Sequence, residues 1–240
     1  KGMAAANSMS VAIGVHIMLA GRFFAHYCAS GFLSKLGRCC SFNNTADGYV
    51  RADGTNSVVV ELLADTNGAT EREEVFGTLA GTVMKHNGRC SSLTAPCGPA
   101  EQEAIAEAVR NAGISALDVD VCEAHASGAV LADAVEVNSL MRCHRQEGSD
   151  ENLDVVAGKS ATGNMVYAAS LASFLRTVDS MKHGTALPTL HLDQMNPHIV
   201  HRNQLSLPDD VTLFRWGTSF GGVMARGFGG TDVYAVAHGR

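Results

Sequence analysis

Apolar and polar positions along the chain alternate with two periods, one typical of strands and one typical of helices. In Ser10–Leu19 the residues Val11, Ile13, Val15 and Ile17 place an apolar side chain at every second position, which predicts a buried strand. Residues 37–56 are rich in Gly, Asn, Asp and Ser and indicate a loop. Further strands are expected at Ser57–Leu63, Val75–Met84, Val119–Ala124, Leu153–Ala157, Val211–Phe214 and Asp232–Ala237, with glycine-rich loop between the last two.

Segments with helical spacing separate these strands. In the clearest one, Pro99 stands at the first helical position, Glu101 lies in the first turn, and Gly113 follows the end. Strands that alternate with helices predict a layered α/β fold. No repeat, linker or boundary interrupts the pattern, so we expect a single domain over residues 1–240. The expected helices are Gly98–Gly113, Gly21–Ser30, Leu131–Arg145 and Met165–Lys182, the last with a wide apolar face that suits a helix buried between layers.

Composition and charge exclude several functions. A hydrophobic content of 46% suffices for a packed core, and a formal net charge of -6 offers no basic surface for nucleic acid. No apolar run reaches the ~18–20 residues of a membrane helix, so no transmembrane segment is expected. The seven cysteines form no CxxC pair, which is typical of reduced thiols. We therefore expect an intracellular protein, in the cytoplasm or an organelle stroma.

Candidate chemistry gathers where two predicted strands end. His125 follows one of these strands, Lys159 follows the next, and Asn164 comes shortly afterwards. Because ligands bind at the carboxyl ends of strands in α/β sheets, the three side chains are expected to face one pocket. The spacing alone leaves open a hydrogen-bonded core histidine and a solvent-exposed lysine. Other histidines indicate no metal site, because their spacing lacks a zinc pattern; they are His183, His191, His198 and His201.

Five ordered blocks of sequence resemble β-ketoacyl synthases. In residues 123–137, EAHASGAVLADAVEV, a histidine precedes a glycine-containing turn and a helix with the pattern D-x-x-E. The other blocks are residues 31–54, 87–105, 158–199 and 227–232. The resemblance implies a thiolase-like fold layered as sheet, helices, sheet, helices, sheet, with this chain covering the end of the first half and the second half. It implies decarboxylative Claisen condensation of acyl and malonyl thioesters in fatty-acid or polyketide synthesis.

The resemblance also assigns roles to particular residues. His125 matches the catalytic histidine that hydrogen-bonds the thioester carbonyl during malonyl decarboxylation. Lys159 matches a lysine that tunes the local field, and Glu123 matches the acidic residue of the histidine motif. Asn164 replaces the second catalytic histidine; its amide can donate a hydrogen bond to an enolate but cannot act as an acid or base.

Substrate contacts are implied as well. Ser127 stands where the family has a threonine that holds the phosphopantetheine arm, and Ala129 departs from a second such threonine. Phe228 matches a gating phenylalanine, and the adjoining Gly229 belongs to the same oxyanion-hole region. About six extra residues are expected within residues 218–232, beside this gate. The resemblance implies no bound cofactor, and it implies phosphopantetheine-linked acyl and malonyl thioesters as substrates, delivered by an acyl carrier protein.

The nucleophile of the reaction is missing from these matches. In the family a cysteine lies on a helix shortly before the segment that matches Ser8–Leu19, and none of the seven cysteines here has that context. Acyl transfer needs a thiolate beside the histidine, so this sequence is expected to act only with an upstream cysteine-bearing segment. A non-catalytic structural or partner subunit of a larger assembly is the alternative. We expect a homo- or hetero-oligomer, because half of a thiolase-like fold leaves apolar faces uncovered.

Overall fold

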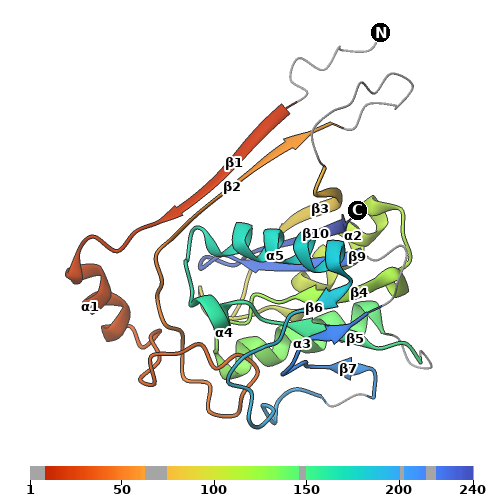
Figure 1. Cartoon of the computed structure of the whole chain (residues 1–240). Helices are drawn as coiled ribbons and strands as arrows, with labels where there is room; N and C mark the ends of the chain where they lie inside the picture. Colours follow the sequence, from red (N-terminus) through yellow and green to blue (C-terminus); the bar gives the residue numbers. More distant parts are fainter. Residues whose placement is uncertain (1–8, 63–74, 146–149, 201–202, 215–219, 240) are drawn as a thin grey trace.

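A mixed six-stranded sheet forms the centre of the molecule. The computed structural model describes residues 9–62, 75–145, 150–200, 203–214 and 220–239 (Figure 1). Its main sheet has the strand order β3-β10-β9-β4-β5-β7, in which β3, β10 and β9 pair antiparallel and β9, β4, β5 and β7 are parallel. The carboxyl ends of β9, β4 and β5 therefore lie at one edge. The strands are β3 (Gly77–His86), β4 (Val119–Glu123), β5 (Leu153–Val156), β7 (Leu205–Ser206), β9 (Phe220–Arg226) and β10 (Thr231–Gly239).

Helices cover both faces of this sheet. Helices α2 (Gly98–Ala112) and α3 (Val130–His144) pack on one face and α5 (Ala169–His183) on the other (Figure 1). Adjacent residues of β4 divide between the two faces: Cys122 packs with Ile105 of α2 and Leu140 of α3, whereas Val121 packs with Met181 of α5. The layered α/β fold expected from the sequence is confirmed. Within the described ranges, no helix is long and apolar enough to cross a membrane.

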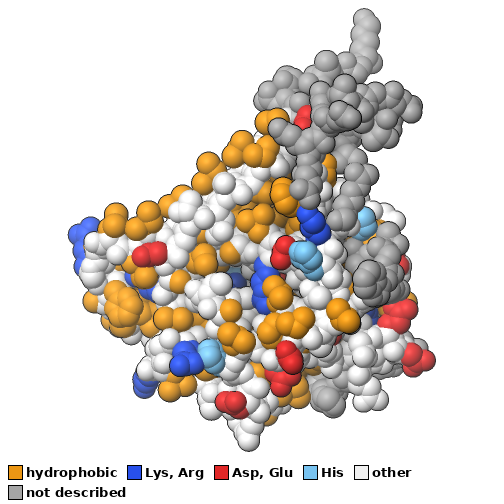
Figure 2. Space-filling view, in the orientation of Figure 1, with side chains coloured by type: hydrophobic (Ala, Val, Ile, Leu, Met, Phe, Trp, Pro, Cys, Tyr) orange, Lys and Arg blue, Asp and Glu red, His pale blue; other side chains and the backbone are white. Residues whose placement is uncertain are grey.

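The predicted strand over Ser10–Leu19 exists, but its predicted burial is wrong. Strands β1 (Met9–His16) and β2 (Gly54–Glu61) form a separate antiparallel ribbon. Its inner face lies against the start of α5, where the Asn56 amide donates to the carbonyl of Ala168 at 3.2 Å. The outer face carries the alternating apolar residues, and Ile13 is 65% exposed. Hydrophobic side chains line this ribbon in Figure 2. The period-two pattern therefore predicts the strand correctly, but it does not predict which face of the strand is buried.

Two other expectations also change. Helix α5 begins at Ala169 rather than near Met165, because Val166 has φ 44° and Asn164 forms a β-bridge with Arg51. Residues 159–162 form a separate short helix, α4 (Lys159–Thr162). The glycine-rich stretch near the end is not loop throughout, because residues 220–226 are β9, paired with both β4 and β10. Helix α2 ends at Gly113 with φ 69°, as its sequence predicts. The remaining elements are α1 (Gly21–Ala29), a 3-10 turn (Ala116–Asp118), β6 (Thr185–Ala186) and β8 (Thr212–Leu213).

Gly81 of β3 permits the closest approach of helix α2 to the sheet. A Cβ at this position would lie 2.5 Å from the carbonyl oxygen of Ala108 and 2.8 Å from the amide nitrogen of Ala112. Because both atoms are backbone, the helix would have to move as a unit. We expect Gly81→Ala to lower the free energy of unfolding by about 1–3 kcal/mol in a denaturant titration. Gly21→Ala is the control, since a Cβ there meets nothing within 4 Å, and equal losses in both variants would contradict the expectation.

Candidate active site

His125 lies at the sheet edge where the parallel strands end. It follows β4 by two residues, and its Nδ1 accepts a hydrogen bond of 3.2 Å from the backbone N–H of Arg226 at the end of β9. A neutral imidazole that accepts at Nδ1 carries its proton on Nε2. Burial, with the nearby charges of Lys159 and Arg226, lowers the pKa of His125 well below its usual range. The side chain is therefore a neutral donor through Nε2 at physiological pH.

Lys159 is buried beside this histidine. Its ammonium donates to the backbone carbonyl of His125 at 2.7 Å, and the residue is only 4% exposed. This position contradicts the alternative of a solvent-exposed lysine. Burial lowers the pKa of Lys159, while the carboxylates of Glu123 and Glu136 act in the opposite direction. The lysine brings a positive charge and a backbone contact to His125 from the end of β5.

Glu123 is one step removed from the histidine. Its carboxylate accepts the backbone N–H of Gly158 at 2.6 Å and pairs with Arg176 of α5 at 3.0 Å. Arg176 also donates to the carbonyl of Pro188 at 3.1 Å. Glu123 thus fixes the turn that presents Lys159, which makes it a positioning residue within this chain.

Asn164 has its amide orientation set by the backbone. Its Oδ1 accepts from the N–H of Val166 at 2.9 Å, and its own main chain bonds to Val50 and Ala52. The Nδ2 group makes no hydrogen bond within the described residues, so it can donate to a ligand. Val166 has φ 44°, and Ala126 beside His125 has φ 22°, both rare for residues other than glycine. Such strain is typical of functional loops.

The proposed substrate contacts are less closely tied to this group. The Ser127 hydroxyl has no hydrogen-bond partner in the part of the chain that is described. Phe228 lies in the turn between β9 and β10, is 54% exposed, and stacks edge-on with Phe32 at 4.8 Å between ring centroids. Gly229 lies in the same turn, and a Cβ there would meet nothing within 4 Å. The turn follows Arg226 directly, so it begins next to His125.

Sequence reasoning missed two carboxylates that hold the histidine loop. Glu136 of α3 accepts the backbone N–H groups of His125 and Ala126, the latter at 2.9 Å. Asp133, one turn earlier, accepts from the N–H groups of Phe42, Gly128 and Ala129 at 3.1–3.2 Å. The D-x-x-E pattern was the available signal, because two acids at this spacing lie on one helix face. Together the two carboxylates fix the loop that carries His125.

Cys39, Cys122 and Cys143 lack the character of an activated nucleophile. Cys39 lies near the site, but it is buried, its thiol donates to the carbonyl of Val50, and burial raises its pKa. Burial likewise raises the pKa of Cys122 to about 12 and that of Cys143 to about 11. A reactive cysteine needs a depressed pKa and access. The acyl-accepting thiolate expected of a condensing enzyme is therefore not provided by these residues.

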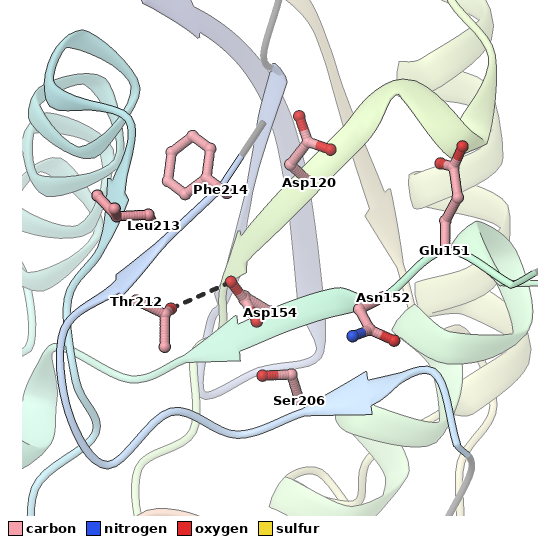
Figure 3. A pocket seen from close by; sticks show the side chains of 8 residues that line it. All are labelled: Asp120, Glu151, Asn152, Asp154, Ser206, Thr212, Leu213 and Phe214. Carbon is pink, nitrogen blue, oxygen red and sulfur yellow. Dashed lines mark hydrogen bonds between the residues drawn. The ribbon is translucent and has the colours of Figure 1, made fainter. Parts of the chain in front are cut away.

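A surface cavity lies at the opposite edge of the sheet. It measures about 520 Å³ and is lined by residues that include Asp120 at the start of β4 and Asp154 at the start of β5 (Figure 3). Thr212 donates to Asp154 at 3.3 Å across it. His125 lies five residues further along the chain than Asp120, about 16 Å away in an extended strand. This cavity takes no part in the histidine site.

The histidines considered for a metal have other contacts or lie apart. His191 hydrogen-bonds Arg38 at 3.2 Å, and His183 lies 3.6 Å from Asp179 on the same helix. His198 donates its backbone N–H to Asn196, and His201 lies outside the described residues. Among the described residues no group of three or more His, Cys, Asp or Glu could hold a metal ion.

Glu101 of α2 is a buried acid behind the site that gives stability a pH dependence. Burial and the charge of Glu136 raise its pKa to about 7. A carboxyl whose folded pKa exceeds its unfolded value, about 4.3, stabilises at low pH and loses that contribution as pH rises through 7. We expect the free energy of unfolding to be about 1–3 kcal/mol lower at pH 8 than at pH 5, and Glu101→Gln to reduce this decline. Thermal melts across this range are the measurement, and equal pH dependence in both proteins would contradict it.

Comparison with known proteins agrees with this architecture. The profile of the β-ketoacyl synthase N-terminal domain matches residues 4–66, and that of the β-ketoacyl synthase C-terminal domain matches residues 76–193. The chain is 32% identical to a phenolphthiocerol/phthiocerol polyketide synthase of Mycobacterium tuberculosis, over 95% of this chain and 12% of that protein. It is 35% identical to the erythronolide synthase EryA3 of Saccharopolyspora erythraea, over 80% of this chain and 6% of that protein.

Solved structures give the same result. The oxazolomycin ketosynthase domain OzmH KS7 of Streptomyces albus JA3453 superposes with a TM-score of 0.90 at 26% identity, covering 97% of this chain and 41% of that one. A ketosynthase from module 6 of the bacillaene synthase of Bacillus subtilis 168 superposes with a TM-score of 0.91 at 23% identity, covering 43% of that chain. The chain therefore belongs to the β-ketoacyl synthase family and has its thiolase-like fold. It spans less than half of these structures and a small part of the synthases.

Proposed function

We propose that this chain forms the part of a polyketide-type ketosynthase site that holds a malonyl thioester and promotes its decarboxylation. The observation that carries the proposal is a pair of oriented donors. Arg226 occupies Nδ1 of His125, and Val166 occupies Oδ1 of Asn164, so each side chain presents an N–H group. Preorganised donors of this kind stabilise a developing oxyanion because they need no reorganisation during the reaction.

The proposed step breaks the bond between the malonyl carboxylate and its methylene carbon. The electron pair moves into the thioester carbonyl and forms an enolate, while carbon dioxide leaves. His125 Nε2–H and Asn164 Nδ2–H donate to the enolate oxygen. Neither transfers a proton in this step, which is consistent with an amide at position 164. Lys159 stabilises the same negative charge from behind the His125 backbone.

Completion of a Claisen condensation requires an acyl thioester on a cysteine. We propose that this cysteine belongs to a part of the complete protein outside these 240 residues. The substrates are then thioesters of the phosphopantetheine arm of an acyl carrier protein. Ser127, Phe228 and Gly229 are the proposed contacts for that arm. Relatives that are parts of polyketide synthases support this class of partner.

A non-catalytic partner subunit is the second candidate function. Asn164 in place of a histidine and Ala129 in place of a threonine favour it, because both changes lie at the proposed substrate site. This hypothesis predicts that the loop around His125 serves packing alone. It also predicts co-purification with other polypeptides whose assembly survives substitution of His125.

The decisive experiment supplies malonyl-pantetheine, a carrier-arm mimic, to the protein that contains this chain. Acetyl-pantetheine and carbon dioxide formed above the uncatalysed rate support the proposal, and no acyl donor is needed for this half-reaction. Malonyl-pantetheine that stays intact with folded protein refutes it and favours the partner-subunit function. Acetyl-pantetheine that forms equally with heat-denatured protein also refutes it.

A further inference from the structure

Arg226 contacts His125 through its backbone and lies at the end of β9. Arg226 is paired with Asp232 in the ladder between β9 and β10, so the position of the Arg226 N–H depends on the backbone conformation at the end of β9. The hydrogen bond to Nδ1 is what selects the ring tautomer with the proton on Nε2. A shift of this strand end would therefore change the tautomer of the His125 ring, which is the proposed donor to the substrate.

The side chain of Arg226 is buried among acids from two further elements. Its Nε lies 3.4 Å from a carboxylate oxygen of Glu101 on α2 and 3.5 Å from one of Asp232 on β10. The Arg226 side chain is 11% exposed, and those of Glu101 and Asp232 are 0% and 1% exposed. Burial raises the pKa of both carboxyl groups, and the charge of Arg226 acts in the opposite direction on each. Buried charges of this kind cost stability compared with apolar packing, which points to a role other than holding the fold.

The charge of Arg226 also reaches the backbone of His125 through Glu136. Burial raises the pKa of the Glu136 carboxyl, and the guanidinium of Arg226 acts in the opposite direction. Glu136 accepts the N–H groups of His125 and Ala126 with both oxygens. Arg226 therefore acts on the histidine in two ways: its own N–H binds the ring, and its charge favours the ionised form of Glu136, which accepts the main-chain N–H groups of the histidine loop.

We propose that the buried side chain of Arg226, clamped by Glu101 and Asp232, is a positioning group that fixes His125 as an Nε2–H donor. Its partners come from α2 and β10, so the clamp couples two elements to a single imidazole. The inference rests on the proposed function for the use of that donor. The ring state itself can be measured without any activity.

The test uses the full chain labelled with ¹⁵N in the histidine rings. The His125 signals are assigned by their absence in His125→Gln, and both ring nitrogens are followed as pH changes. Wild-type protein should show one unprotonated and one protonated nitrogen throughout the neutral range. In Arg226→Met the midpoint of His125 protonation should move to higher pH, with loss of the single tautomer. Arg226→Lys, which retains a charge, should restore part of the wild-type pattern.

Lys85→Met is the matched control, because Lys85 on β3 pairs with Glu103 and Glu107 of α2 at the surface. It removes a cation near the same helix and should leave the His125 signals unchanged. An unchanged His125 spectrum in folded Arg226→Met overturns the proposal, as does an equal change in Lys85→Met. If Arg226→Met does not fold, the charge-balanced pair Arg226→Gln with Glu101→Gln replaces it, and an unaltered His125 tautomer there also overturns the proposal.

Activity separates this inference from the proposed function. If the protein decarboxylates malonyl-pantetheine, Arg226→Met should slow the reaction about tenfold to a hundredfold, as expected for a misplaced catalytic group. If wild-type protein is inactive, the proposed function fails, while the ring measurement still decides the role of Arg226. A wild-type rate in Arg226→Met would overturn the positioning role even if the function holds.

Discussion

Replacing His125 with alanine is expected to lower the rate of malonyl thioester decarboxylation by about 10²–10³-fold. The Nε2–H group of this ring is one of two oriented donors in the site, and loss of one oxyanion donor typically costs this much. His125→Gln should retain part of the rate, because its amide can present an N–H group although without the same orientation. Release of carbon dioxide from malonyl-pantetheine under single-turnover conditions is the measurement.

The control for this substitution is His183→Ala, since His183 is an exposed histidine at the end of α5. It should keep the wild-type rate. Thermal melts of each variant separate loss of the donor from loss of the fold. A folded His125→Ala protein with unchanged decarboxylation would show that the donor is not used, and the loop would then be structural.

Asp133→Ala should produce the largest loss of stability, about 3 kcal/mol or more. The carboxylate accepts three backbone N–H groups, from Phe42, Gly128 and Ala129, and the residue is 1% exposed. Alanine leaves these donors without a partner, and each buried unpaired donor costs about 1–3 kcal/mol. Asp133→Asn keeps one oxygen acceptor and should lose less. Chemical denaturation at constant pH is the measurement.

Asp179→Ala provides the comparison for Asp133→Ala. Asp179 lies on the surface of α5, where it meets only His183 at 3.6 Å among the described residues, so its removal should change stability by no more than about 0.5 kcal/mol. A loss for Asp133→Ala as small as that for Asp179→Ala would mean that water can reach the three amides. The loop would then be held by its other contacts, such as the bond from Ser41 to the carbonyl of Ala126 at 2.6 Å.

Local sequence signals predicted the helices and the central strands well. Pro99 and Gly113 delimit α2, and the alternation of apolar residues located β4 and β5 to within a residue or two. Strand β9 escaped prediction because glycines replace its apolar residues. Those glycines are required by packing: a Cβ at Gly222 would collide with the ring of Tyr234 and the sulfur of Cys122. The local sequence around Gly222 does not show that Tyr234 and Cys122 fill the space beside it.

The sequence predicts the position of the site, but it does not predict the hydrogen bonds that hold His125 in place. His125 and Lys159 follow strands, and parallel strands bring such residues to one edge, so their convergence followed from topology. Glu136 accepts the backbone N–H groups of His125 and Ala126, and Arg226 donates its own backbone N–H to the His125 ring; every residue type except proline supplies such a group. The residue types at the bound positions therefore do not reveal these hydrogen bonds. The predicted burial of β1 was wrong for a related reason: the alternation of apolar residues does not show whether another layer covers that face of the strand.

The position of β9 and β10 at the centre of the sheet governs when this site can form during synthesis. β3, an edge strand, pairs only with β10 among the described strands, and the ring of His125 is fixed by Arg226, 101 residues later. Contacts of such sequence separation form slowly because long loops must close first. On the ribosome, at roughly 5–20 residues per second, the histidine loop must wait several seconds for its last partner. Until then the nascent chain presents an open sheet edge, so folding of this domain and assembly of its site are the same late event.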